Sequence, residues 1–184
     1  MRSKSRRIWL VALSIVASLA GPSRPALAEH TFEIVKSFEL PAFASALTLG
    51  PDGALYGTTR EGGTANRGTI FRVEMDGTFE RLHSFDGNGG QGGSGLVVGS
   101  DGARYGTTPE GGPSNAGTVF KIDGAGTFTS LHSFGGPDGR RPLAALVVGS
   151  DGALYGTTQE GGSSNRGTLF RIDDAGSFTS LHSF

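Results

Sequence analysis

The chain has 184 residues, a formal net charge of −1, 32 glycines and no cysteine. The absence of cysteine excludes a disulfide scaffold, a thiolate zinc site and a cysteine nucleophile. So much glycine without the three-residue period of collagen fits a turn-rich β protein or a low-complexity linker, and the length suggests a single domain.

Residues 1–28 are predicted to be a signal peptide. An apolar run from Ile8 to Ala20 is too short for a spanning helix, and Ala26-Leu27-Ala28 supplies a cleavage signal. The alternative is an uncleaved membrane anchor. The segment before the apolar run also resembles a twin-arginine export motif, although the strongly apolar run favours the general secretory route. We therefore expect an exported protein, located in the periplasm, outside the cell or at the cell surface.

Cleavage after Ala28 would change the charge balance. It removes five basic residues and no acidic ones, which leaves 11 basic and 17 acidic residues and a net charge of −6. A mildly acidic protein has no electrostatic footprint for nucleic acid and is not attracted to an anionic membrane. We expect neither partner for the mature chain.

The rest of the sequence is an internal repeat with a period of 49 to 50 residues. Three sets of aromatic residues recur at that spacing. They are Tyr56, Tyr105 and Tyr155; Phe71, Phe120 and Phe170; and Phe85, Phe134 and Phe184. A repeat domain is therefore expected over residues 29–184, with units of about 39–85, 86–134 and 135–184 and a leading strand at 31–38.

Each unit is predicted to contain four short strands. In the first unit they are 46–49, 54–59, 69–75 and 78–85, with tight-turn signatures at 50–53 and 76–77 and longer loops at 60–68 and 86–93. This order is typical of an antiparallel meander and, repeated in tandem, of an all-β fold made of three four-stranded blades of a partial β-propeller. The alternative is a β-trefoil, which also has three units of four strands.

The repeated motifs resemble those of a known family. The segment 53–63, followed by 66–73, recurs at 102–122 and 152–172, except that Arg104 replaces leucine in the second unit. These motifs resemble the GloVer (Gloeo/Verruco) tandem repeat of bacterial exported proteins. The resemblance implies an extracellular propeller-like array and implies no particular activity.

Three blades are too few to close a ring, because propellers typically have 4–8. Three accounts follow: a truncated fragment, which is favoured, two chains that associate into a six-bladed ring, or an open arc of three blades. Self-association is thus one expected interaction of the chain.

A ligand, if there is one, is expected on the face that carries the longer loops, because binding residues concentrate on loops held by a rigid scaffold. The candidate ligand-binding residues are Arg60, Glu61, Asn66, Glu110, Asn115, Glu160 and Asn165. One Glu and one Asn per loop are too few for calcium, which takes six to eight oxygens. The competing interpretation makes each Glu a solvated charge and each Asn a turn cap. No metal and no cofactor are expected.

The repeated histidines are not expected to act in catalysis. Each of His83, His132 and His182 precedes a serine, and adjacent strand residues point to opposite faces. The same position is Lys36 in the leading strand, so these histidines are expected to face solvent. The recurring phenylalanines are expected to form the inter-blade core. The glycine at Gly57 and at its equivalents suggests the close approach of a neighbouring backbone.

The leading functional hypothesis is an exported, non-catalytic binding or cell-surface interaction module for a glycan or a protein, with no catalytic residues. The rival is an extracellular glycan-active hydrolase or lyase. The near identity of the repeats counts against the rival, since enzymes usually place catalytic residues in one unit only. A third reading is a fragment with no independent function.

Overall fold

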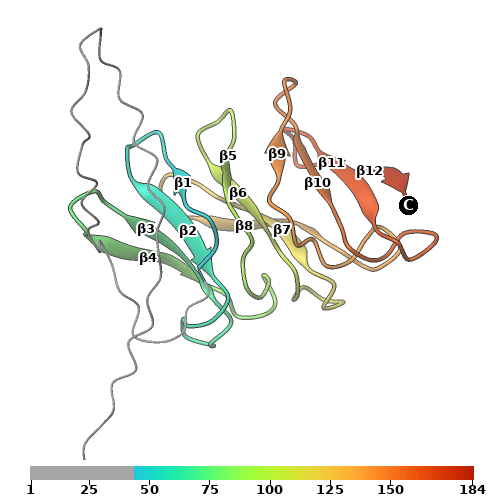
Figure 1. Ribbon diagram of the computed structural model, residues 1–184, viewed down its shortest axis with the longest axis horizontal. Helices are drawn as coiled ribbons and strands as arrows, with labels where there is room; N and C mark the ends of the chain where they lie inside the picture. Colours follow the sequence, from blue (N-terminus) through green and yellow to red (C-terminus); the bar gives the residue numbers. More distant parts are fainter. Residues whose placement is uncertain (1–43) are drawn as a thin grey trace, which may run out of the picture. The chain divides into compact units, whose positions relative to one another are not determined.

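The structure is a computed structural model that describes residues 44–184, so the predicted signal peptide and leading strand lie outside the described residues. The described residues form three four-stranded sheets (Figure 1). Blade 1 consists of β1 (Thr48–Leu49), β2 (Leu55–Thr59), β3 (Thr69–Val73) and β4 (Phe79–Ser84). Blade 2 consists of β5 (Val97–Val98), β6 (Arg104–Thr108), β7 (Thr118–Ile122) and β8 (Phe128–Ser133). Blade 3 consists of β9 (Val147–Val148), β10 (Leu154–Thr157), β11 (Thr168–Ile172) and β12 (Phe178–Ser183).

Every sheet is an antiparallel meander in which neighbours in sequence are neighbours in the sheet. This confirms the predicted all-β blades, and the trefoil alternative is not needed. The turns that join the first two strands of each blade lie at the same end of the three sheets (Figure 1). In blade 1 this turn is closed by a hydrogen bond from the Gly53 amide to the Gly50 carbonyl, at 3.0 Å.

The outer strand of every blade contains a β-bulge. In blade 1, Ile70 pairs with His83 and Phe71 pairs with Arg81, so Leu82 is an extra residue. The same shift occurs in blades 2 and 3. One extra residue reverses the facing of all side chains beyond it. The bulge therefore lets the two ends of one strand serve opposite faces of the sheet.

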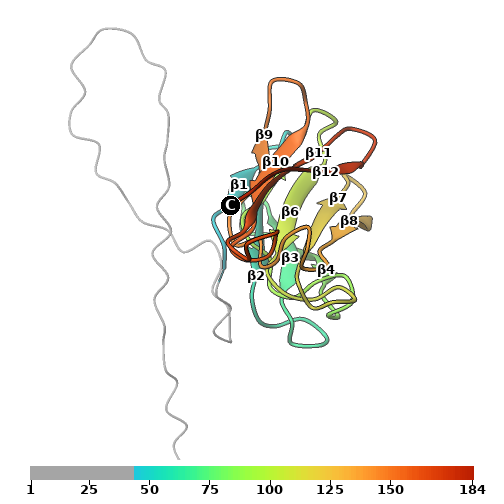
Figure 2. The same ribbon diagram turned by 90° about the vertical axis from the view of Figure 1, so that its right-hand side faces the viewer.

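We call the face of a blade that contacts the following blade its trailing face, and the other its leading face. Interface 1 lies between blades 1 and 2, and interface 2 between blades 2 and 3; Figure 2 shows the sheets one behind another. At interface 1, Phe85 contacts the ring of Phe120 edge-on at 5.6 Å between ring centroids. At interface 2, Phe134 contacts Phe170 in the same way at 5.2 Å.

Both interfaces have an apolar core. The buried residues of interface 1 are Ala54, Tyr56, Ile70, Phe85, Leu96, Phe120 and Ile122. Those of interface 2 are Ala116, Val119, Phe134, Leu146, Leu154, Phe170 and Ile172. Phe85, Phe120, Phe134 and Phe170 thus form the inter-blade core as expected. Phe71 is buried but belongs to neither interface, and Phe184 is 52% exposed.

The prediction that the histidines face solvent is wrong for the first two. His83 stacks on Phe128 of the next blade at 4.0 Å between centroids, and His132 stacks on Phe178 at 3.8 Å. The bulge before each histidine directs it to the trailing face, and a bulge leaves no mark in a strand pattern. Of the three repeated histidines, His182 alone is exposed.

The glycine in the second strand is explained by a side chain and not by a neighbouring backbone. A Cβ atom at Gly57 would lie 2.6 Å from the Phe71 ring, which crosses from the paired strand. Gly106 and Gly156 make room for Phe120 and Phe170 in the same way. Glycine at these three positions thus leaves room for the aromatic ring of the paired strand.

Within residues 44–184, no helix has the length and apolar character needed to cross a membrane.

Candidate functional site

The asparagines of the long loops hold the loop backbone. Asn66, Asn115 and Asn165 have φ angles of 51°, 49° and 54°, in the left-handed region that asparagine tolerates better than most residues. The Asn66 side chain accepts a hydrogen bond from the Gly62 amide at 2.9 Å, and the other two repeat this contact. Their side-chain oxygens are therefore already engaged in capping the loop.

The glutamates lie where loops of adjacent blades meet. The backbones of Glu110 and Glu160 form bridges with Gln91 and Arg140 of the preceding connection. The Glu160 carboxylate also pairs with Arg141 at 3.2 Å. The long loops thus lie at one end of the blades, with Arg60 exposed and Glu61 half-buried. The binding role of the seven loop residues stays a prediction.

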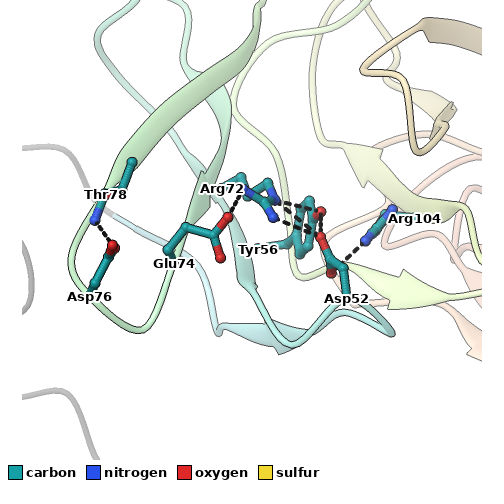
Figure 3. Close-up of polar contacts among 7 residues, drawn as sticks. All are labelled: Asp52, Tyr56, Arg72, Glu74, Asp76, Thr78 and Arg104. Atoms are coloured by element: carbon teal, nitrogen blue, oxygen red, sulfur yellow. Dashed lines mark hydrogen bonds and ion pairs between the residues drawn. The ribbon is translucent and has the colours of Figure 1, made fainter.

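The opposite end carries a repeated polar group of three residues. In blade 1, the Tyr56 hydroxyl donates to Asp52 Oδ2 at 2.7 Å, and Arg72 pairs with the same oxygen at 3.0 Å (Figure 3). Asp101, Tyr105 and Lys121 repeat the group in blade 2. Asp151, Tyr155 and Arg171 repeat it in blade 3. The group fastens each tight turn to its own sheet.

Arg104 is the residue that breaks the repeat. It lies on the leading face of β6, where the other blades have Leu55 and Leu154. Its guanidinium lies 3.9 Å from the centroid of the Tyr56 ring and donates from Nη2 to Asp52 Oδ1 at 3.1 Å (Figure 3). The residue is 3% exposed, and its buried Nε has no hydrogen-bond partner among the described residues. Arg104 therefore joins blade 2 to the polar group of blade 1.

A pocket of about 500 Å³ lies beside Arg104, at the tight-turn end of interface 1. Five charged side chains line it: Asp52, Asp101, Arg104, Lys121 and Asp123. We call this the Arg104 pocket. Three carboxylates and two cations give its lining a net charge of −1, so it attracts neither a strongly anionic nor a strongly cationic ligand.

The carboxyls of the pocket are held in their ionised form. Partial burial tends to raise the pKa of Asp52, but hydrogen bonds from Tyr56 and Arg72 outweigh it and lower the pKa to about 2. Burial also tends to raise the pKa of Asp101. Hydrogen bonds, with that from Lys121 the strongest, outweigh it and lower the pKa. The backbone amide of Thr127 is the main cause of the lowered pKa of Asp123. None of the three is poised to donate a proton near neutral pH.

The equivalent position at interface 2 has a different lining. This pocket, of about 290 Å³, is bordered by Asp101, Leu154, Asp173 and Asp174. Leu154 stands where Arg104 stands at interface 1, and it belongs to the apolar core. The larger pocket with charges of both signs is thus confined to interface 1. Among residues 44–184, no three histidine or acidic side chains gather in a way that could hold a metal ion.

The seven loop residues predicted from the sequence lie at the other end of the blades, so the sequence analysis did not identify this pocket. The signal was present, because Arg104 departs from leucine in an otherwise regular repeat. A charged residue at an inward-facing strand position indicates a local requirement that the other repeats lack.

The profile of the Gloeobacter/Verrucomicrobia repeat matches residues 25–184. The chain belongs to this repeat family. The match includes every residue that the structure describes and confirms the resemblance carried by the repeated motifs. No curated protein matches the chain in sequence.

Solved structures with similar folds are propeller-type proteins. The repeat chain superposes on virginiamycin B lyase from Staphylococcus aureus with a TM-score of 0.58 and 21% identity, covering 79% of this chain and 44% of that one. It superposes on a gluconolactonase from Xanthomonas campestris with a TM-score of 0.54 and 15% identity, covering 78% and 48%. The chain thus spans less than half of each structure. At these identities the likeness shows the fold alone.

Proposed function

We propose that this repeat protein is an exported, non-catalytic binding module and that its ligand is a neutral glycan bound in the Arg104 pocket. The observation that carries the proposal is the pocket itself: charges of both signs, fixed by ion pairs, at the inter-blade position where Arg104 breaks the repeat.

The lining suits a polyhydroxylated ligand. A sugar hydroxyl both donates and accepts, and the pocket offers carboxylates that accept beside Arg104 and Lys121, which donate. The Asp52 carboxylate and the Lys121 ammonium remain partly exposed and are held by their ion pairs. A prearranged set of donors and acceptors lowers the ordering cost of binding. The volume also falls within the range of about 300–1,000 Å³ that small-molecule sites occupy.

The pocket lacks what glycoside hydrolysis requires. Most such enzymes use a carboxylic acid with a raised pKa beside an ionised carboxylate. Asp52, Asp101 and Asp123 all have lowered pKa values. Asp123 also uses its carboxylate to accept from the amides of Ala125 and Thr127 in its own turn. These features favour binding over turnover.

Calorimetric titration of the full chain with neutral oligosaccharides tests the proposal. Binding should occur, and Arg104→Leu should weaken it at least tenfold because the donor and its inter-blade ion pair are lost. Arg171→Leu is the matched control. It removes the cation of the polar group in blade 3, the counterpart of Lys121. Arg171 does not line the pocket, so the change should leave the affinity unchanged.

The same samples should be analysed for cleavage products. If the wild-type chain releases products and the Asp101→Asn variant does not, the protein is a glycan-active enzyme and the binding proposal is wrong. Titration with a protein-free polyuronate provides a charge control. If the polyuronate binds and neutral sugars do not, the neutral-glycan proposal is wrong.

A further inference from the structure

The connection from blade 2 to blade 3 differs in charge from the connection from blade 1 to blade 2. Gln91 and Gly92 lie beside the long loops in the first connection, and Arg140 and Arg141 take their places in the second. The backbone fixes this equivalence, because the amides of Gly92 and Arg141 each donate to a carbonyl of the preceding long loop, at 2.8 and 2.9 Å. Two cations therefore occupy positions that are neutral at interface 1.

Arg141 adopts a backbone conformation that suits glycine. Its φ angle is 55°, close to the 65° of Gly92. Within residues 44–184, the long-loop asparagines are the only other residues besides glycine with a positive φ. This conformation is strained for arginine and unstrained for glycine. The Nε atom of Arg141 is also buried without a hydrogen-bond partner in the described chain, which is a further cost to the folded state.

The contacts of the two arginine side chains do not offset these costs. Arg141 Nη1 lies 3.2 Å from Glu160 Oε1, and Arg140 Nε lies 3.9 Å from Glu160 Oε2. The three side chains are 34% to 51% exposed, and ion pairs this exposed contribute little to stability. Glu110, the counterpart of Glu160, forms the same backbone bridge with Gln91 and needs no arginine to do so. A strained residue that the fold does not require indicates a functional role.

The two arginines are held in place by their backbones and keep donors free for a ligand. The backbones of Arg140 and Glu160 exchange two hydrogen bonds, at 2.7 and 3.0 Å, and the Arg141 carbonyl accepts from the Gln159 amide at 3.1 Å. The distance from Arg140 to Glu160 is too long for a hydrogen bond, so its guanidinium makes none to a described residue. Two guanidiniums and one carboxylate leave this group with a net charge of +1.

We propose that Arg140 and Arg141 form a second binding site, which takes the carboxylate of a uronic acid unit in a glycan. The guanidinium presents parallel donors that match the two oxygens of a carboxylate. Arg140 supplies these donors, Arg141 supplies the second charge, and Glu160 keeps the two cations together. A net charge of +1 matches one carboxylate and not a run of acidic side chains. The site is independent of the neutral-glycan proposal, since none of its residues lines the Arg104 pocket.

Calorimetric titration of the full chain with an oligogalacturonate and with its methyl ester tests the proposal. The ester keeps the sugar and removes the charge. The double variant Arg140→Gln/Arg141→Gly reproduces the Gln91-Gly92 sequence of the first connection. It should weaken binding of the acid by about tenfold and leave binding of the ester unchanged. Its melting temperature should not fall, because glycine relieves the strain at position 141.

Two further variants serve as controls. Arg81→Gln removes an exposed arginine of β4 and should leave the affinity for the acid unchanged, although the loss of charge is similar in kind. Arg104→Leu should weaken binding of neutral sugars and leave the carboxylate-dependent part of binding intact, so the two proposals can fail separately.

Three results would overturn the carboxylate site. The first is equal affinity of the wild-type chain for the acid and the ester. The second is a loss of affinity in the double variant no larger than in Arg81→Gln. The third is a lower melting temperature of the double variant, which would assign the two arginines to the fold. Binding of hexaglutamate without binding of the oligogalacturonate would likewise replace the glycan by an acidic peptide.

Discussion

Interfaces 1 and 2 share their apolar contacts and differ in their polar ones. Each has a phenylalanine edge-to-face contact and a histidine stacked on the next blade. At the tight-turn end, however, interface 1 has Arg104 bound to Asp52, whereas interface 2 has Leu154 in the core. The apolar residues therefore serve the stacking that every blade needs, and polar differences, Arg104 among them, give interface 1 a distinct pocket.

The histidines add a second difference. His132 contacts the Asp138 carboxylate at 2.7 Å, and Gly89 occupies the position in blade 1 that corresponds to Asp138. His83 instead is half-buried against Phe85 and Phe128. The equivalent histidines of near-identical repeats thus have different contacts: His132 has a carboxylate partner, and His83 packs against aromatic rings.

The largest effects should come from the shared apolar contacts. Phe85→Ala and Phe134→Ala should each lower the free energy of unfolding by about 3–5 kcal/mol, because each empties a fully buried aromatic site. Phe184→Ala should change it by less than about 0.5 kcal/mol at protein concentrations where the chain is monomeric. Urea denaturation measures all three. Unequal losses for Phe85 and Phe134, by more than about 1.5 kcal/mol, would show that the two apolar cores are not equivalent.

A smaller effect on the free energy of unfolding is expected from the protonation of Asp52 at acidic pH. Its pKa is lowered to about 2 from an ordinary value of 3.8, so the folded state binds fewer protons than the unfolded state between these values. The contribution to stability is complete above about pH 4 and disappears as the pH falls towards 2. Because the side chain is 36% exposed, solvent screening limits it to below about 1 kcal/mol. Asp52→Asn should flatten this part of the pH profile, and an unchanged profile would contradict the assignment.

Replacing Arg104 by leucine makes interface 1 resemble interface 2. The free energy of unfolding should change by less than about 1 kcal/mol, because Asp52 keeps Tyr56 and Arg72 and no buried charge is left alone. Thermal denaturation measures the contribution of Arg104 to stability, and the binding titration measures its contribution to ligand binding. A loss above about 3 kcal/mol would indicate that Arg104 serves stability and not ligand binding.

The smallest effect should come from His83. Burial lowers the pKa of this histidine below 6.5, although the nearby Asp86 charge opposes the shift. The unfolded chain then binds more protons, so this contribution to stability is present above about pH 6.5 and is lost as the pH falls below it. Urea denaturation midpoints should be measured at pH 7.5 and 5.5. The decrease in midpoint on acidification should be slightly smaller for His83→Gln than for the wild type. An equal loss would assign the acid sensitivity to other groups.

The sequence was sufficient for the architecture because each blade repeats the same local signals. The turns at 50–53 and 76–77 and the apolar strands predicted the four-stranded meander, and the recurring phenylalanines predicted the inter-blade core. Strand β3 ends at Val73, before the predicted Met75, because Glu74 accepts from Gly77 and donates to Thr78 in the turn. Such end effects depend on the turn's hydrogen bonds and not on residue preference.

Two features could not be read from the residue pattern. The bulge at Leu82 reverses the facing of His83, and nothing in the local residue types requires an extra residue there. The pocket joins Asp52 to Arg104 across two blades, which only the stacking of the sheets brings together. The seven loop residues were chosen because they lie on long loops, whereas the pocket lies beside the short turns. The break in the repeat at Arg104, and not position on a loop, is the sequence signal that leads to the pocket.

The most direct test of the Arg104 pocket is to map bound ligand by amide chemical shifts. A neutral oligosaccharide should be titrated into isotope-labelled protein. Shifts should concentrate at residues 51–56, 101–104 and 121–124, on both sides of interface 1. Shifts confined to the long loops 60–68, 109–117 and 159–167, or to the Leu154 position of interface 2, would contradict the account.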